Sequence, residues 1–224
     1  MEMPFVKTKY RTIKTTIPAP GTKELFNELA KYEARSMHGQ LPVVWDKAID
    51  FQVYDKSGNK WIDFTSTIFV ANAGHSNPYI IKAIQTQLKR PLLHTYTFAS
   101  DIRAKFLKKL IEFTPAFCQK AFLMSSGTEA TECAIKLMRM WGQKISKDKV
   151  GIISFTGSMH GRTMGAEMLR GKPESSEWIG YKDPNIHHLT FPYPWTESSF
   201  EKDIAKLIVN VDINKIAGFA IESY

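Results

Sequence analysis

The chain has little cysteine, no long apolar run and no dense cluster of basic residues. Its two cysteines, Cys118 and Cys133, are too few for a disulfide framework, and neither Cys-x-x-Cys nor His-Glu-x-x-His occurs. No apolar stretch approaches the roughly 20 residues that span a bilayer, and no secretory signal opens the chain. We therefore expect a cytoplasmic protein without a membrane segment.

Charge gives no sign of a nucleic-acid partner. Basic residues exceed acidic residues by 30 to 22, a net charge of +8, but they are spread along the chain. There is no arginine-rich arm and no run of basic residues interleaved with aromatic ones, which is the pattern of many nucleic-acid-binding proteins. We expect small-molecule ligands instead.

The first third of the chain predicts a hairpin followed by a helix. Residues 49–64 hold two apolar runs around the polar stretch 55–59, which favours half-exposed antiparallel strands. Ser76-Asn77-Pro78 predicts a helix start with proline in the first turn, where a missing N–H is tolerated. The residues expected on the buried face of this helix are Ile81, Ile84 and Leu88.

From Ala121 onward, short apolar strands alternate with helices. The expected strands are 121–124, 150–155, 187–191 and 216–221, and the expected helices cover about 128–143, 163–169 and 200–209. This alternation predicts a mostly parallel α/β sheet, in which ligands bind at the carboxyl ends of strands. His187 and His188 are neighbours in one strand, so their rings point to opposite faces, and we expect no metal site.

The turn Ser126-Gly127-Thr128-Glu129 follows an expected strand and opens a helix. Free backbone N–H groups and the positive end of the helix dipole meet at such a turn, which suits a phosphate group. A capping box explains Ser126 and Glu129 equally well, with Glu129 reaching back toward the cap. These residues alone leave both interpretations open.

Three further clusters lie at the ends of expected elements. Residues 157–165 contain three glycines and His160, which could contact a cofactor or be a satisfied turn histidine. Residues 72–78 are most simply a loop before a helix. Glu222 ends the last expected strand, where a carboxylate is either a functional group or the point at which the strand meets water.

In order and spacing, these clusters resemble the class III aminotransferases, the ω-aminotransferase group of fold-type I enzymes that use pyridoxal 5'-phosphate (PLP). The similar segments are residues 74–78, 126–139, 160–163 and 217–222, and the resemblance spans about 49–224. It implies an α/β fold with the mostly parallel sheet of a large PLP-binding domain. Residues 1–72 would be an arm and the N-terminal segment of the small domain, and residues 73–224 the first part of the large domain.

The resemblance also implies a cofactor site. The backbone amides of Gly127 and Thr128, assisted by the hydroxyl of Ser126 or Thr128, would hold the PLP phosphate. Met159 and His160 would lie against the pyridine ring, and Glu222 would lie near the cofactor. Met159 departs from the family, which commonly has Tyr or Phe there.

The substrate entrance is implied at Thr67-Ile68-Phe69, where Phe69 would touch the amino donor. This stretch is a second departure, because the family often has Gly-Ile-x at these positions.

The implied activity is ping-pong transfer of an amino group from an amine or amino acid to a keto acid or aldehyde, by a homodimer. In the family, the Schiff-base lysine and the aspartate on the pyridine nitrogen follow the strand that ends at Glu222. We therefore expect no catalytic residue in this chain and a truncated fold, the front half of a longer protein. The alternatives are an aminomutase or decarboxylase of the same fold, and a degenerate PLP-fold domain without catalysis. A nucleotide-binding domain is weaker, since neither Gly-x-Gly-x-x-Gly nor a Walker lysine follows the turn.

Overall fold

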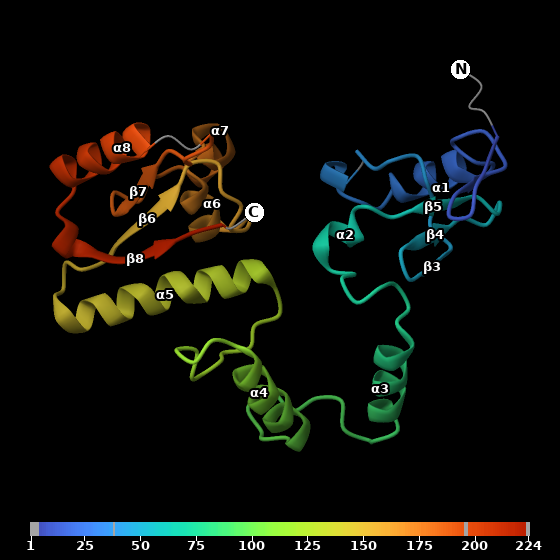
Figure 1. The fold of residues 1–224 in the computed structure, drawn as a ribbon, viewed down its shortest axis with the longest axis horizontal. Coiled ribbons are helices and arrows are strands. Elements are labelled where there is room, and N and C mark those ends of the chain that lie inside the picture. Colours follow the sequence, from blue (N-terminus) through green and yellow to red (C-terminus); the bar gives the residue numbers. More distant parts are fainter. Residues whose placement is uncertain (1–4, 38, 195–196, 223–224) are drawn as a thin grey trace. The chain divides into compact units, whose positions relative to one another are not determined.

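The structure is a computed structural model that describes residues 5–37, 39–194 and 197–222. The chain divides into two compact units, residues 1–101 and 102–224, and Figure 1 labels their elements. The expected boundary between residues 72 and 73 concerns the two domains of the family and stays a prediction. Every helix in the described residues is too short or too polar to cross a lipid bilayer.

The first unit contains a five-stranded antiparallel sheet in the order β1-β2-β5-β4-β3. Its strands are β1 (Val6–Lys7), β2 (Thr12–Ile13), β3 (Lys47–Ile49), β4 (Gln52–Tyr54) and β5 (Lys60–Ile62). Its helices are α1 (Thr22–Leu29), the 3₁₀ turn η1 (Arg35–Met37), α2 (Ser66–Phe69) and α3 (Pro78–Leu88).

The expected hairpin is confirmed as β4 and β5, but its turn is more buried than its polarity predicts. Asn59 is fully buried, and its side chain accepts hydrogen bonds from the N–H groups of Lys14 and Thr15 at 2.7 and 3.2 Å. The Asn59 amide also donates to Asp55 Oδ2 at 2.7 Å. Each buried polar atom thus has a partner, which removes the cost of its desolvation.

Helix α3 begins where the sequence predicts, with Asn77 as N-cap and Pro78 in the first turn. The expected buried face is wrong, because Ile81, Ile84 and Leu88 are 41%, 54% and 60% exposed. Their helical spacing is real, but no described element covers them.

Helix α2 is a single left-handed turn. Four consecutive residues, Ser66, Thr67, Ile68 and Phe69, have φ values of 46°, 55°, 57° and 70°. This conformation costs roughly 1–2 kcal/mol for each non-glycine residue, because Cβ approaches the following carbonyl oxygen. A turn without glycine must therefore be held by its surroundings.

The second unit contains a parallel sheet in the order β7-β6-β8. Its strands are β6 (Gly151–Phe155), β7 (Ile186–Leu189) and β8 (Ile216–Ala220). Its helices are α4 (Asp101–Phe113), which begins at the unit boundary, α5 (Gly127–Ile145), α6 (Met164–Arg170), α7 (Pro173–Ser176) and α8 (Glu197–Asn210), with the 3₁₀ turns η2 (Glu177–Ile179) and η3 (Ile213–Lys215).

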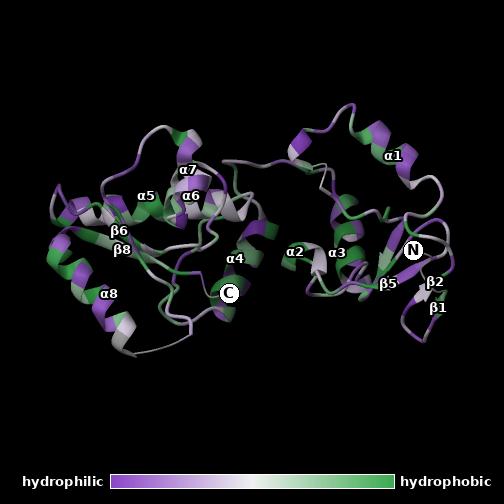
Figure 2. Ribbon diagram, turned by 90° about the horizontal axis from the view of Figure 1, so that it is seen from above, coloured by the Kyte–Doolittle hydropathy of each residue, from purple (hydrophilic) through white to green (hydrophobic). Residues whose placement is uncertain are grey.

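The helices of this unit cover both faces of the sheet. The chain runs from β6 to β7 in one direction and from β7 past β6 to β8 in the other, so right-handed crossovers put α6 and α8 on opposite faces. In Figure 1, α5 lies along β8 on the side away from α8, and Figure 2 shows hydrophobic and hydrophilic residues alternating along α8. The core beneath α5 and α6 is formed by Ile135, Ile152 and Leu169.

The expected strands at 150–155, 187–191 and 216–221 are confirmed with shifted ends, whereas the expected strand at 121–124 is wrong. Residues 121–124 form no regular element, and Phe122 is 74% exposed. A strand needs a neighbour to pair its N–H and C=O groups. No described strand pairs with this segment.

Candidate functional site

The N-terminus of α5 presents two unpaired backbone donors. Ser126 is the N-cap in an extended conformation, and its Oγ accepts from Glu129 N–H at 3.2 Å. Within the described residues, no acceptor lies in hydrogen-bond range of the N–H groups of Gly127 and Thr128. Nothing lies within 4 Å of where a Gly127 Cβ would stand. The cap is therefore compatible with an anion site, because it uses the third N–H and leaves the first two open.

Glu129 closes the cap in a different way from the predicted capping box. Its carboxylate accepts a hydrogen bond from the Ser126 hydroxyl at 3.3 Å. In a capping box, the carboxylate would accept from the backbone N–H of the N-cap residue instead.

The 157–163 loop packs directly against this helix start. Gly161 has a φ of 137°, and a Cβ there would stand 2.5 Å from Thr128 Oγ1. Glycine at this position therefore allows the loop to approach Thr128 closely.

Glu132, one turn into α5, holds the start of α6. Its Oε1 accepts hydrogen bonds from Thr163 Oγ1, from Gly165 N–H at 2.9 Å and from Ala166 N–H at 3.1 Å. The N-cap residue Thr163 makes no side-chain cap of its own. Glu132 thus supplies from another helix the acceptor that the N-terminus of α6 needs.

Glu222, two residues after the end of β8, fixes the same loop. Glu222 Oε2 accepts a 2.6 Å hydrogen bond from the backbone N–H of Met159. The two residues meet because β6 and β8 are adjacent and parallel, so both carboxyl ends lie at one edge of the sheet. The Met159 side chain is 45% exposed.

The environment of His160 favours its neutral form. Burial lowers its pKa below the ordinary 6.5, and the nearby Glu222 carboxylate opposes that shift in part. Its Nε2 shares a 3.2 Å hydrogen bond with Oγ of Ser154, which is fully buried in β6. A neutral imidazole in this position can stack on or hydrogen-bond a flat ring without adding charge.

A cavity of about 220 Å³ lies at this edge of the sheet, lined by Thr156, Gly157, Ser158, Phe191 and Glu222. Beside it, the ring of Phe155 meets Phe191 and Phe219 edge-on, both at a centroid distance of 5.4 Å. The site therefore has an acidic and hydroxyl-bearing side and an aromatic side.

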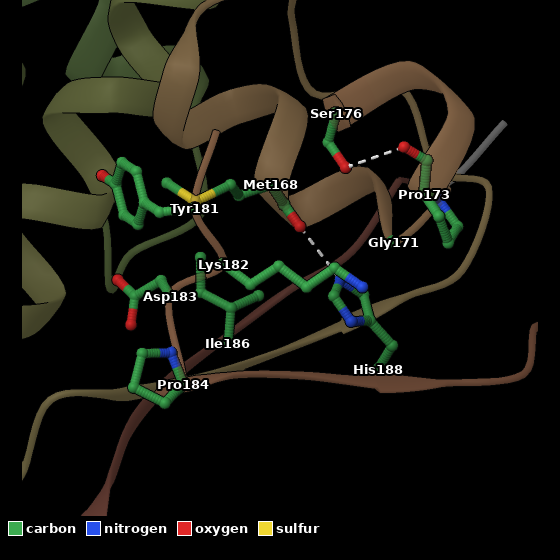
Figure 3. Close-up of a pocket in the computed structure, with 10 residues that line it drawn as sticks. All are labelled: Met168, Gly171, Pro173, Ser176, Tyr181, Lys182, Asp183, Pro184, Ile186 and His188. Carbon is green, nitrogen blue, oxygen red and sulfur yellow. Dashed lines mark hydrogen bonds between the residues drawn. The ribbon is translucent and has the colours of Figure 1, made fainter. Parts of the chain in front are cut away.

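A second cavity, of about 290 Å³, contains none of the predicted site residues (Figure 3). His188 on β7 faces α6, and its Nε2 lies 3.0 Å from the Met168 carbonyl oxygen. Burial lowers the His188 pKa, with a partial opposing effect from this contact. His188 therefore ties α6 to the sheet.

The structure thus brings together five of the predicted residues, Gly127, Thr128, Met159, His160 and Glu222, around the ends of α5, β6 and β8. Ser126 caps α5 beside them, and Phe69 belongs to the other compact unit. Sequence reasoning missed Ser154 as the partner of His160. The signal was a lone hydroxyl in the apolar strand Gly151–Phe155.

Comparison with known proteins gives a consistent family. The family model described as aminotransferase class III matches residues 33–224. The ornithine aminotransferase of Saccharomyces cerevisiae is 35% identical over 194 residues, covering 80% of this chain and 45% of that protein.

Solved structures agree in fold. A transaminase from the marine bacterium Virgibacillus matches with a TM-score of 0.78 and 22% identity, over 88% of this chain and 47% of that one. A PMP-bound aminotransferase from Vibrio fluvialis matches with a TM-score of 0.74 and 25% identity, over 87% of this chain and 47% of that one. The chain spans about half the length of the relatives it matches, and it belongs to the class III aminotransferase family.

Proposed function

We propose that this chain is the phosphate-binding and ring-binding part of a PLP-dependent aminotransferase. The observation that carries the proposal is the pair of unpaired N–H groups of Gly127 and Thr128 beside the loop that Glu222 anchors. Two adjacent donors at a helix start suit the oxygens of a phosphate ester. Membership of the class III family supports PLP as the compound that carries it.

The residues at this edge offer a partner for each part of PLP. Gly127 and Thr128 would hold the phosphate, with the Thr128 hydroxyl as a further donor. Met159 and the neutral His160 would contact the ring, and Glu222 would hold their loop in place. A thioether against an aromatic ring contributes about 0.3–1.5 kcal/mol, so Met159 can replace an aromatic side chain in part.

When bound, PLP supplies the electron-withdrawing ring that amino transfer requires. This chain's residues bind and orient it: the α5 start fixes the phosphate, and the 157–163 loop fixes the ring. We assign no acid or base role to the described residues. The overall activity we propose is amino transfer from an amine or amino acid to a keto acid or aldehyde.

Phe69 and the preceding turn are proposed to line the substrate entrance. The exposure of Ile68 and Phe69 supports this role, because contact with the carbon chain of a donor would remove apolar surface from water, which is favourable. The ornithine aminotransferase relative makes ornithine the first donor to assay.

The test uses the protein at its natural full length, stripped of cofactor. Titration with PLP, followed by absorbance, measures binding, and formation of glutamate from 2-oxoglutarate with ornithine, alanine or taurine measures transfer. We expect saturable binding and transfer from at least one donor. Binding without consumption of any amine would favour the non-catalytic alternative, and decarboxylated or rearranged product would favour the decarboxylase or aminomutase. Failure to bind PLP would contradict all of these.

Two features of the assembled protein are proposals as well. A homodimer is supported by the family resemblance and is tested by light scattering of the full-length protein. A cytoplasmic location is supported by the low cysteine content and is tested by cell fractionation.

A further inference from the structure

The left-handed turn α2 is held by a buried carboxylate. Asp63 Oδ1 accepts hydrogen bonds from Thr65 N–H at 2.8 Å and from the Thr65 hydroxyl at 2.6 Å. Thr65 Oγ1 in turn accepts from the N–H of Thr67 at 3.3 Å. Asp63 therefore fixes both the backbone and the side chain of Thr65, and Thr65 caps the turn.

His75 fixes Asp63 from the opposite side. Its Nε2 lies 2.7 Å from Asp63 Oδ2, and the two side chains are 13% and 3% exposed. Burial opposes ionisation of Asp63, but the hydrogen bonds from Thr65 and His75 outweigh it, and the pKa lies below the ordinary 3.8. Asp63 is thus a buried charge with a partner on each oxygen, the arrangement that a buried carboxylate needs.

The sheet anchors this pair through the backbone. Asp50 and His75 exchange backbone hydrogen bonds of 2.8 and 2.7 Å, and Asp63 N–H donates to Phe51 O at 2.8 Å. The ring of Trp45 meets the His75 ring edge-on at 5.7 Å. The pair is therefore held by several contacts, whereas the turn beside it has an unfavourable backbone conformation.

The turn presents apolar side chains. Ile68, Phe69 and Val70 are 72%, 58% and 76% exposed, and part of α2 is hydrophobic in Figure 2. A right-handed turn over the same residues would direct these side chains elsewhere, because the left-handed turn is close to its mirror image.

We propose that Asp63 and His75 are positioning residues that keep α2 left-handed, so that Ile68 and Phe69 form an apolar wall for the carbon chain of the amino donor. The inference rests on the proposed function and adds the residues that set donor preference. It assigns the Gly74-His75 motif a role in specificity, beyond that of a loop before α3.

The test compares KM values in the full-length protein. His75→Ala is expected to raise KM for an apolar donor such as phenylethylamine about ten-fold, the lower end of the range for loss of apolar contacts in a binding pocket. The KM for glycine, which has no side chain to contact the wall, and the PLP dissociation constant are expected to stay within about two-fold. Asp46→Asn is the matched control, because it alters a different carboxylate of the same unit.

A second substitution separates positioning from general stability. Thr67→Gly removes the steric cost of positive φ. The double variant His75→Ala, Thr67→Gly should therefore have a KM for phenylethylamine close to that of the parent. Backbone NMR couplings of residues 66–69 should show positive φ in the parent and the double variant. Equal KM changes for both donors, or no recovery by Thr67→Gly, would overturn the inference. A parent protein that fails to bind PLP would contradict the proposed function itself.

Discussion

The backbone N–H of Met159 donates a 2.6 Å hydrogen bond to Glu222, although 63 positions separate the two residues. This bond joins the loop after β6 to the end of β8. It therefore links the two segments proposed to surround the cofactor ring.

Glu222→Ala should weaken PLP binding by about ten-fold, or about 1.4 kcal/mol, because the Met159 N–H loses its acceptor and the loop is freed. Glu222→Gln keeps an acceptor oxygen and serves as the matched control, with affinity close to that of the parent. Titration with PLP measures both. Equal weakening by Ala and Gln would show that the charge matters rather than the anchoring of Met159.

Glu132→Ala should lower the free energy of unfolding by about 2 kcal/mol, because the N-terminus of α6 loses its acceptor. Urea denaturation followed by circular dichroism measures the change. Glu201→Ala on the exposed side of α8 is the control, with an expected change below about 0.5 kcal/mol. If the Glu132→Ala protein were as stable as this control, Glu132 would not cap α6.

His160 should make the protein less stable as the pH falls. Because burial depresses its pKa in the folded state, its contribution is fully present above 6.5 and is lost as the pH falls from 6.5 through the depressed value. The unfolded chain binds the proton first, so acid favours unfolding. As the pH is lowered from about 8 to about 5, the urea midpoint should fall less steeply in His160→Gln than in the parent. The exposed His94→Gln is the control, and a parental slope in His160→Gln would contradict the expectation.

The sequence was sufficient for the elements that local chemistry determines. Asn77-Pro78 starts α3, and Ser126 caps α5, because capping depends on a few neighbouring residues. The three strands with partners in the chain were also predictable. Residues 121–124 have the same apolar character but no described partner, and pairing is a property of two strands.

The site was predictable in its composition but not in its connections. The resemblance identified His160 and Glu222, yet Ser154 beneath His160 and Glu132 at the start of α6 act through contacts between distant segments. Thr67 is the clearest case. A threonine gives no sign of a positive φ, because the hydrogen bonds around this turn come from Thr65 and from Asp63, which lie before it.

The central claim is that the first N–H groups of α5 hold the PLP phosphate, and Gly127→Pro tests it directly. Proline removes the N–H at the first helical position, where it is tolerated, and Ser126 already has the extended backbone that proline requires before it (φ −142°, ψ 161°). Gly127→Ala keeps the N–H and is the matched control.

The measurement is the PLP dissociation constant of the three full-length proteins, with urea midpoints to confirm equal folding. We predict that Gly127→Pro binds at least about ten-fold more weakly than Gly127→Ala, the loss expected for a charge-assisted hydrogen bond. Equal affinity of the Pro and Ala variants would contradict the account.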